Sequence, residues 1–125
     1  MDIDIIAPDH ESPEEGSFSP AMRAGGWVFT SGQVGERTDG TVPESFPDEV
    51  ELALDNLESV LAAAGSDLAH VMRIEVILAD MSDFAAMNEV YRKRMIAPRP
   101  ARYTHGSALA PGYRVEFVAT AVVVD

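Results

Sequence analysis

The apolar residues between positions 45 and 64 recur with the period of an amphipathic helix. Four of them follow one another at intervals of four, three and four positions: Val50, Leu54, Leu57 and Leu61. This spacing places them on one helix face and predicts a helix over residues 45–64. Ser45 stands at the N-cap position, and Gly65 follows the last turn as a helix stop.

A second amphipathic stretch predicts a helix over residues 82–95, capped by Ser82. The stripe that faces inward consists of Phe84, Met87, Asn88, Tyr91 and Met95. Cations in the last turn complement the negative end of the helix dipole, and the three here are Arg92, Lys93 and Arg94. We prefer this role to a nucleic-acid-binding patch. Pro98 and Pro100 end the helix.

The remaining apolar segments have the two-residue alternation of β-strands. Residues 21–23 and 27–31 form a predicted hairpin around Gly25-Gly26. A strand over residues 71–79 has two faces, one with Met72, Ile74, Val76 and Leu78 and the other with Arg73, Glu75 and Ile77. Two final strands, residues 101–108 and 113–124, are joined by a turn at Pro111-Gly112.

These elements follow the order β-β-α-β-α-β-β, which is typical of an α+β fold with a mixed sheet and two helices on one face. The domain covers residues 16–125, and residues 1–15 are either a tail or an edge strand at 3–6. The face opposite the helices would carry four aliphatic residues: Ile77, Val118, Val122 and Val124. We therefore expect an oligomer that covers this face.

Composition narrows the possible chemistry. The 125 residues suit one domain, and the absence of cysteine excludes disulfides, thiolate zinc sites and cysteine nucleophiles. A net charge of −12 argues against nucleic acid as the main partner, because the phosphate backbone requires a basic surface. No apolar run approaches the ~20 residues of a membrane span, and no signal peptide is evident, so we expect a cytoplasmic protein. The histidines His10, His70 and His105 have no metal-site spacing, and nucleotide-binding and nucleophile-elbow motifs are absent.

Arg102 and Glu116 are the candidate functional residues. Arg102 opens a strand directly after Pro100-Ala101. A guanidinium fixed in this way can bind a carboxylate through two hydrogen bonds. The alternative is that Arg102 forms an ordinary ion pair at the surface. Glu116 lies on the last strand. If the two C-terminal strands pair, Glu116 approaches Arg102, either as its counter-ion or as a group that orients water.

Several short motifs resemble the Rid family, the reactive-intermediate deaminases also called YjgF. They are Phe29–Gln33, Ala53–Leu57, Ala62–Gly65, Asp83-Phe84 with Asn88 and Tyr91, Pro100–Arg102, and Val115-Glu116. The resemblance covers residues 16 to 124. It implies a fold like that of single-domain chorismate mutase, a homotrimer with clefts between subunits, and hydrolysis of 2-imino acids or their enamines to 2-keto acids and ammonia, without a metal or cofactor.

The resemblance also assigns roles to residues. Arg102 would hold the substrate carboxylate, and Glu116 would orient or deprotonate water together with backbone groups near Gly32 and Thr104. Asn88 matches a position near the cleft. Gly32 and Asn88 each have a structural alternative, as a strand-end glycine and as a loop-capping residue.

The chain departs from the family pattern at Phe18, where many members carry tyrosine, and at Thr104, which replaces a ligand-contacting cysteine. Two segments are also shorter than in a deaminase of the family: the stretch between Asn88 and Arg102, and the loop after Arg102. These departures leave the substrate open. One alternative is a non-catalytic small-molecule-binding or chaperone-like trimer, and another is a sibling hydrolase that acts on an aminoacrylate or carbamate compound. A ribonuclease is disfavoured by the charge.

Overall fold

The structure is a computed structural model that describes residues 1–8 and 16–124. Seven strands form one mixed sheet: β1 (Ile3–Ile6), β2 (Ala21–Ala24), β3 (Trp27–Thr30), β4 (Gln33–Val34), β5 (Val71–Leu78), β6 (Ala101–Gly106) and β7 (Val115–Val122). Their order is β1-β2-β3-β7-β5-β6, and β4 also pairs with β7. All pairs are antiparallel except β5 and β6.

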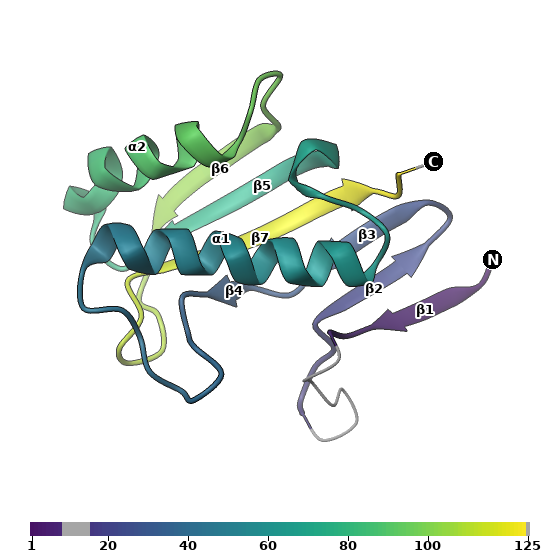
Figure 1. Ribbon diagram of the computed structural model, residues 1–125, viewed down its shortest axis with the longest axis horizontal. Coiled ribbons are helices and arrows are strands. Elements are labelled where there is room, and N and C mark those ends of the chain that lie inside the picture. The colour runs from purple at the N-terminus through teal and green to yellow at the C-terminus, as the bar shows by residue number, and fades with distance from the viewer. Residues whose placement is uncertain (9–15, 125) are drawn as a thin grey trace.

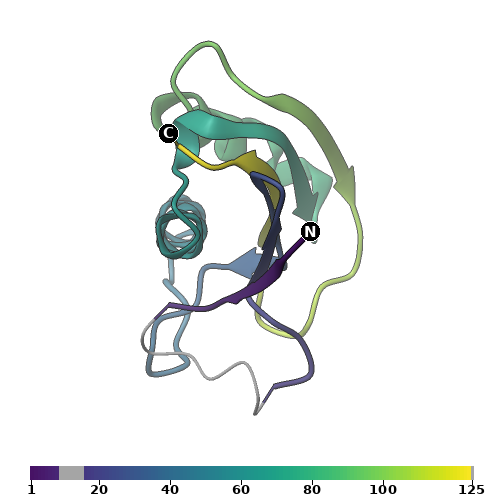
Figure 2. The same cartoon turned by 90° about the vertical axis from the view of Figure 1, so that its right-hand side faces the viewer.

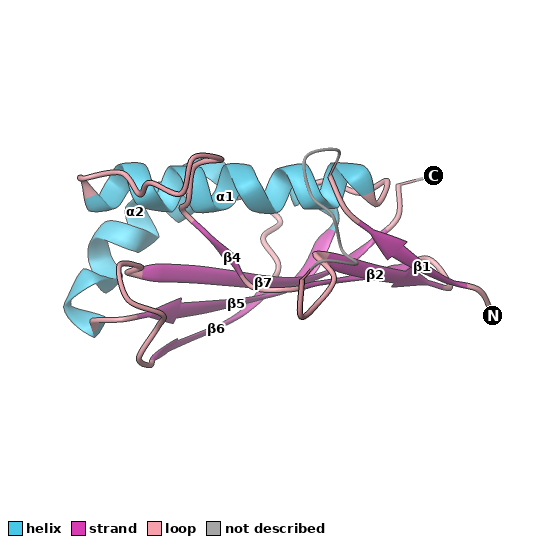
Figure 3. Ribbon diagram, turned by 90° about the horizontal axis from the view of Figure 1, so that it is seen from below, coloured by secondary structure: helices cyan, strands magenta, loops and turns pink. Residues whose placement is uncertain are grey.

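Two helices, α1 (Phe46–Ala63) and α2 (Phe84–Arg94), lie on one side of this sheet (Figures 1 and 3). The sheet curves around α1 (Figure 2). Two short 3₁₀ turns, η1 (Leu68–His70) and η2 (Met81–Asp83), precede β5 and α2. The mixed sheet with two helices on one face, predicted from the sequence, is confirmed.

The first helix begins and ends as its sequence predicts. The Ser45 hydroxyl accepts a hydrogen bond from the Asp48 amide at 3.2 Å. The four apolar residues of its stripe are fully buried. At the other end Gly65 has φ +82°, and Arg23 of β2 donates to the Ala64 carbonyl at 2.8 Å. The C-terminal carbonyls of α1 are thereby tied to the N-terminal hairpin.

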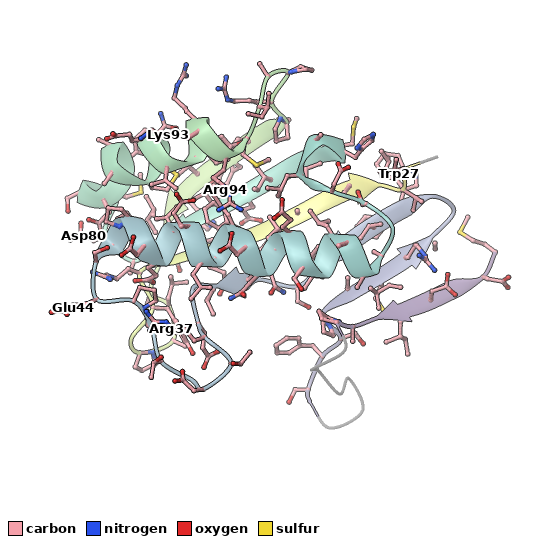
Figure 4. The ribbon with its side chains drawn as sticks, in the orientation of Figure 1. Trp27, Arg37, Glu44, Asp80, Lys93 and Arg94 are labelled. Carbon is pink, nitrogen blue, oxygen red and sulfur yellow. The ribbon has the colours of Figure 1, made fainter. Side chains whose placement is uncertain are left out.

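The second helix corrects the prediction that Ser82 is its cap. The Asp80 side chain instead accepts from the Ser82 amide at 2.9 Å and stabilises η2, so that α2 begins at Phe84. In the last turn Arg94 pairs with Glu51 and Asp55 of α1 at 2.8 Å each (Figure 4). This arginine therefore ties the two helices together as well as complementing the dipole.

The strand β5 corrects a second prediction. Met72 was expected on the same face as Ile74, but a bulge between Val71 and Arg73 shifts the alternation by one residue. As a result Val71 is buried and Met72 is 53% exposed. From Arg73 onward the alternation follows the sequence.

Glu49 is a fully buried carboxylate that joins α1 to the start of β7. It accepts from the backbone amide of Arg114 at 2.7 Å and from the Nε of the same residue at 2.6 Å. The guanidinium also donates to the carbonyls of Pro43 and Glu44 at 3.1 Å. This network fixes the segment that precedes α1 against the strand that carries Glu116.

The sheet face opposite the helices carries many apolar side chains beside a few charged ones, and it is uncovered in the described residues. Strand partners in register share a face, which places the following residues together there: Ile3, Ile5, Met22, Trp27, Phe29, Ile77, Val118 and Val122. We call this the open face. Among the predicted residues Val124 lies beyond β7 and is 41% exposed. None of the described helices is long and apolar enough to cross a membrane.

Candidate functional site

Arg102 extends from β6 beneath α2. It is in register with Ile74 of β5, a buried core residue, so its side chain lies on the helix side of the sheet. The guanidinium donates to Oδ1 of Asn88 at 2.7 Å and lies 4.6 Å from the ring centroid of Tyr91 and 5.6 Å from that of Phe84. Both distances are within the range of cation–π contacts. No carboxylate of the described residues forms an ion pair with this guanidinium.

The three α2 residues around Arg102 lie on one helix face, because their spacing is i, i+4 and i+7. The sequence stripe had assigned them to the core. Tyr91 is buried as expected, but Phe84 is 37% exposed and Asn88 holds the guanidinium. The spacing of the stripe was the signal that located these residues; their contact with Arg102 could not be predicted without the strand order.

Two hydroxyls beside Arg102 are buried and have no hydrogen-bond partner in the described residues, those of Tyr91 and Thr104. Burial raises the pKa of the Tyr91 hydroxyl, and the charges of Arg102 and Arg99 offset part of that rise. Thr104 is two residues from Arg102 on the same side of β6. Arg102, Asn88 and Thr104 together form what we call the guanidinium half-site.

Glu116 lies on the open face, between Val34 of β4 and Ile77 of β5. Gly32 packs directly against it: a Cβ at Gly32 would lie 2.6 Å from Cδ and 3.0 Å from Cγ of Glu116. A side chain at position 32 is therefore incompatible with the observed position of the carboxylate. Burial raises the pKa of Glu116, and the nearby charge of Glu75 raises it further.

A groove of about 410 Å³ adjoins Gly32. Phe18 lines it and is 69% exposed. Asn56 of α1 also lines the groove, and its side-chain amide donates hydrogen bonds to the carbonyls of Val34 and Glu36 at 2.8 and 3.0 Å, which fixes residues 34–36 against the helix. The other lining residues are Pro8, Pro20, Gln33, Arg37, Thr38, Gly40 and Ser59. Gly32, Glu116 and Phe18 form what we call the carboxylate half-site.

The two half-sites do not meet within one chain. The approach of Glu116 to Arg102 was expected only if the two C-terminal strands pair, and they do not, because β5 lies between β6 and β7. Arg102 is in register with Ile74 and Glu116 with Ile77, three residues apart along β5, so the two side chains lie on opposite faces of the sheet. Glu116 is therefore not the counter-ion of Arg102 in the same chain.

The described histidines bond to single carboxylates. His70 lies 2.6 Å from Asp67, and His105 lies 2.9 Å from Glu75 on the open face. His10 lies outside the described residues. Within those residues no group of three His, Asp or Glu side chains is arranged to hold a metal ion.

Comparison with known proteins extends over nearly the whole chain. The profile of a family described as Endoribonuclease L-PSP matches residues 9–123. A 2-iminobutanoate/2-iminopropanoate deaminase from Mus musculus is 40% identical over 110 residues, which are 86% of this chain and 82% of the mouse protein. A YjgF family protein from Neisseria meningitidis has a TM-score of 0.85 and 36% identity, over 100% of this chain and 98% of that one. The E. coli protein TdcF, solved with bound serine, has a TM-score of 0.86 and 29% identity, over 97% and 99% of the two chains.

Proposed function

The chain belongs to the endoribonuclease L-PSP family, also called YjgF or Rid, and on that premise we propose that it hydrolyses reactive 2-imino acids to 2-keto acids and ammonia. The observation that carries the proposal is the guanidinium of Arg102. It is held by Asn88 and stacked on Tyr91, yet it forms no ion pair with a carboxylate of the described residues. A guanidinium fixed in this way is prepared to accept a carboxylate through two parallel hydrogen bonds.

The active protein is a homotrimer whose subunits contact one another through the open face. Two observations support this. The open face carries many apolar side chains and is uncovered in the described residues, and each half-site lacks the other within its own chain. A cyclic trimer unites the guanidinium half-site of one subunit with the carboxylate half-site of its neighbour, so that three equivalent clefts result.

In such a cleft Arg102 binds the substrate carboxylate, and the unpartnered hydroxyl of Thr104 supplies a further hydrogen bond. Glu116 of the neighbouring subunit takes a proton from water as the water oxygen bonds to the imine carbon, and it delivers this proton to the imine nitrogen, which gives a carbinolamine. Glu116 then takes the proton of the carbinolamine hydroxyl and delivers it to the amino nitrogen as the C–N bond breaks, so that the 2-keto acid and ammonia are released. The enamine tautomer enters the same sequence after its carbon is protonated. Positioning contributes most, because the imine is already electrophilic.

The environment of Glu116 suits this role. A carboxyl whose pKa is raised exchanges protons more effectively close to neutral pH than an ordinary one does. Phe18 lacks the hydroxyl that many relatives place at this position, so it offers the cleft an apolar ring only. This leaves Glu116 as the group of the carboxylate half-site that carries protons.

The assay that tests the proposal generates imines from several amino acids with an amino-acid oxidase in the presence of semicarbazide, which traps the imine. Active protein should lower the yield of semicarbazone and raise the release of keto acid and ammonia. An unchanged semicarbazone yield for every amino acid tested, with the trimer intact by light scattering, would refute the deaminase proposal.

Phe18 favours a second candidate, a trimer that binds keto or amino acids without turnover. The relative TdcF from E. coli was solved with a bound amino acid, serine. Calorimetry with 2-oxobutanoate, run beside the imine assay, separates the two functions, because a binder gives heat and no acceleration. The predicted cytoplasmic location belongs to the same proposal, and cell fractionation tests it.

A further inference from the structure

Three titratable side chains lie next to one another on the open face, one on each of three adjacent strands. Glu116 of β7 is in register with Ile77 of β5, and Glu75 lies two residues before Ile77 on the same face. His105 of β6 is also in register with Ile77. Its Nε2 lies 2.9 Å from Oε2 of Glu75, and both side chains are about one-third exposed.

We propose that Glu75, held in place by His105, is a positioning residue that sets the pH range over which Glu116 exchanges its proton. This rests on the role given to Glu116 under the proposed function. Two carboxylates on the same face of adjacent strands repel each other, which favours a bound proton on the more buried one. The pKa of Glu116 is raised first by burial and then by Glu75, in agreement with this arrangement.

The other charged groups of the strands around Glu116 lie farther along the strands or are directed elsewhere. In the proposed cleft Arg102 of the neighbouring subunit lowers the pKa of Glu116, but it does so equally in wild type and in the Glu75 and His105 variants. β4 offers Val34 and Gln33, which carry no charge. Directly before β7, Arg114 directs its guanidinium to Glu49. On β5, Arg73 lies beyond Glu75 and is in register with Thr120, four residues from Glu116. Among the charged residues of the described strands β4, β5 and β7, Glu75 is therefore the one that the register places nearest to Glu116.

His105 acts on Glu75 in two ways. Its ring nitrogen orients the carboxylate through the 2.9 Å hydrogen bond, and the ring of Tyr103 packs beside it with the centroids 5.0 Å apart. When its ring is protonated, His105 also forms an ion pair with Glu75, which offsets the charge of that carboxylate. Loss of Glu75 and loss of His105 should therefore shift the titration of Glu116 in opposite directions.

The test uses the full-length protein with uniformly ¹³C-labelled glutamate. The side-chain carbonyl signal of Glu116 is assigned by its disappearance in Glu116→Gln, and its chemical shift is followed against pH in wild type and variants. In Glu75→Gln the midpoint of the Glu116 titration should shift to lower pH. In His105→Asn it should shift to higher pH. Glu89→Gln removes an equal charge from an exposed position on α2 and should leave the midpoint unchanged.

The pH profile of kcat/KM for imine hydrolysis should follow the same order, because the deprotonated form of Glu116 is the base and activity is lost as the pH falls through its pKa. A Glu116 midpoint in Glu75→Gln equal to that in Glu89→Gln would overturn the proposal. An unshifted midpoint in His105→Asn would remove His105 from it. Because the NMR titration needs no turnover, an inactive wild-type protein would refute the proposed function and leave this inference to be decided separately.

Discussion

Arg102 and Glu116 lie on opposite faces of one sheet, with β5 between the strands that carry them. Neither residue has the other within reach in its own chain, although both are held firmly by local contacts: Arg102 by Asn88 and Tyr91, and Glu116 by its packing on Gly32. A site that needs both must draw them from two chains. This requirement gives the strongest test of the proposed cleft.

Mixed trimers should recover activity from two inactive variants. Arg102→Ala retains Glu116, and Glu116→Gln retains Arg102, so a neighbouring pair of the two chains in the right order forms one intact cleft. Random assembly of equal amounts should give about a quarter of the wild-type activity. The measurement is imine hydrolysis after the two variants are unfolded together and refolded.

The control is a mixture of the two variants that were refolded separately. It should stay inactive for as long as subunits do not exchange. If refolding together also gave no activity while light scattering showed trimers, Arg102 and Glu116 would not belong to one cleft formed by two chains.

Substitution of Arg102 should reduce substrate binding more than it affects the fold. Arg102→Ala removes two charge-assisted hydrogen bonds to a carboxylate, and we expect kcat/KM to fall by about 100-fold or more. Arg102→Lys keeps the charge without the planar fork and should lie between wild type and alanine. The measurements are steady-state kinetics and calorimetric binding of 2-oxobutanoate.

Arg92→Ala is the matched control, because it removes a cation from the exposed side of α2. It should change kcat/KM by less than about twofold. Equal losses in the two alanine variants would mean that general charge, and not a specific receptor, attracts the substrate.

Gly32→Ala should impair turnover by displacing Glu116. The added methyl group would lie 2.6 Å from Cδ of Glu116, so the carboxylate has to move. Misplacement of a catalytic group by about 1 Å costs up to ~100-fold in rate, and we expect kcat to fall by at least about tenfold. Binding of 2-oxobutanoate should persist, because Arg102 is untouched.

Gly16→Ala provides the comparison, since its Cβ would be 3.5 Å from the nearest heavy atom, an ordinary contact. This variant should have wild-type kcat. Full activity in Gly32→Ala would show that the observed position of Glu116 is not required for the reaction.

Loss of Glu49 should destabilise the fold without touching the chemistry directly. Glu49→Ala leaves the backbone amide of Arg114 and its guanidinium, which is 39% exposed, without their acceptor, and the loss of a charged hydrogen-bond partner costs about 1.5–3 kcal/mol. Urea denaturation at a fixed protein concentration measures the effect. Glu89→Ala breaks only an exposed pair with Lys93 and should change stability by less than about 1 kcal/mol; a similarly small change for Glu49→Ala would contradict the prediction.

Local patterns predicted the elements of the fold well. The helix stripe of α1, its Ser45 cap and the Gly25-Gly26 hairpin each depend on residues close together in the sequence, and the structure confirms them. Two predictions were wrong because a single residue altered the alternation of a strand or the hydrogen bonding at the start of a helix. The bulge beside Met72 shifts the alternation of β5, and Asp80 accepts a hydrogen bond from the backbone amide of Ser82, so that Ser82 belongs to η2 and does not cap α2.

The candidate site was predicted residue by residue but not in its arrangement. Arg102 and Glu116 stand on consecutive strands in sequence, which suggested that the strands pair. The long connection through α2 makes β6 parallel to β5 at the edge of the sheet, and this places β5 between them. Glu75 and His105 were missed because nothing in the sequence spacing brings them to Glu116; only the register of β5 with both neighbours does.

The proposed division of the cleft between subunits would also link catalysis to the amount of protein present. A monomer would expose the apolar open face and would hold two incomplete halves of a site, so it would contribute nothing to the rate. Below the concentration at which subunits associate, activity would therefore decline more steeply than the protein itself. A cell with a low concentration of this chain would therefore lose imine hydrolysis out of proportion to the loss of protein, unless newly made subunits assemble before they diffuse apart.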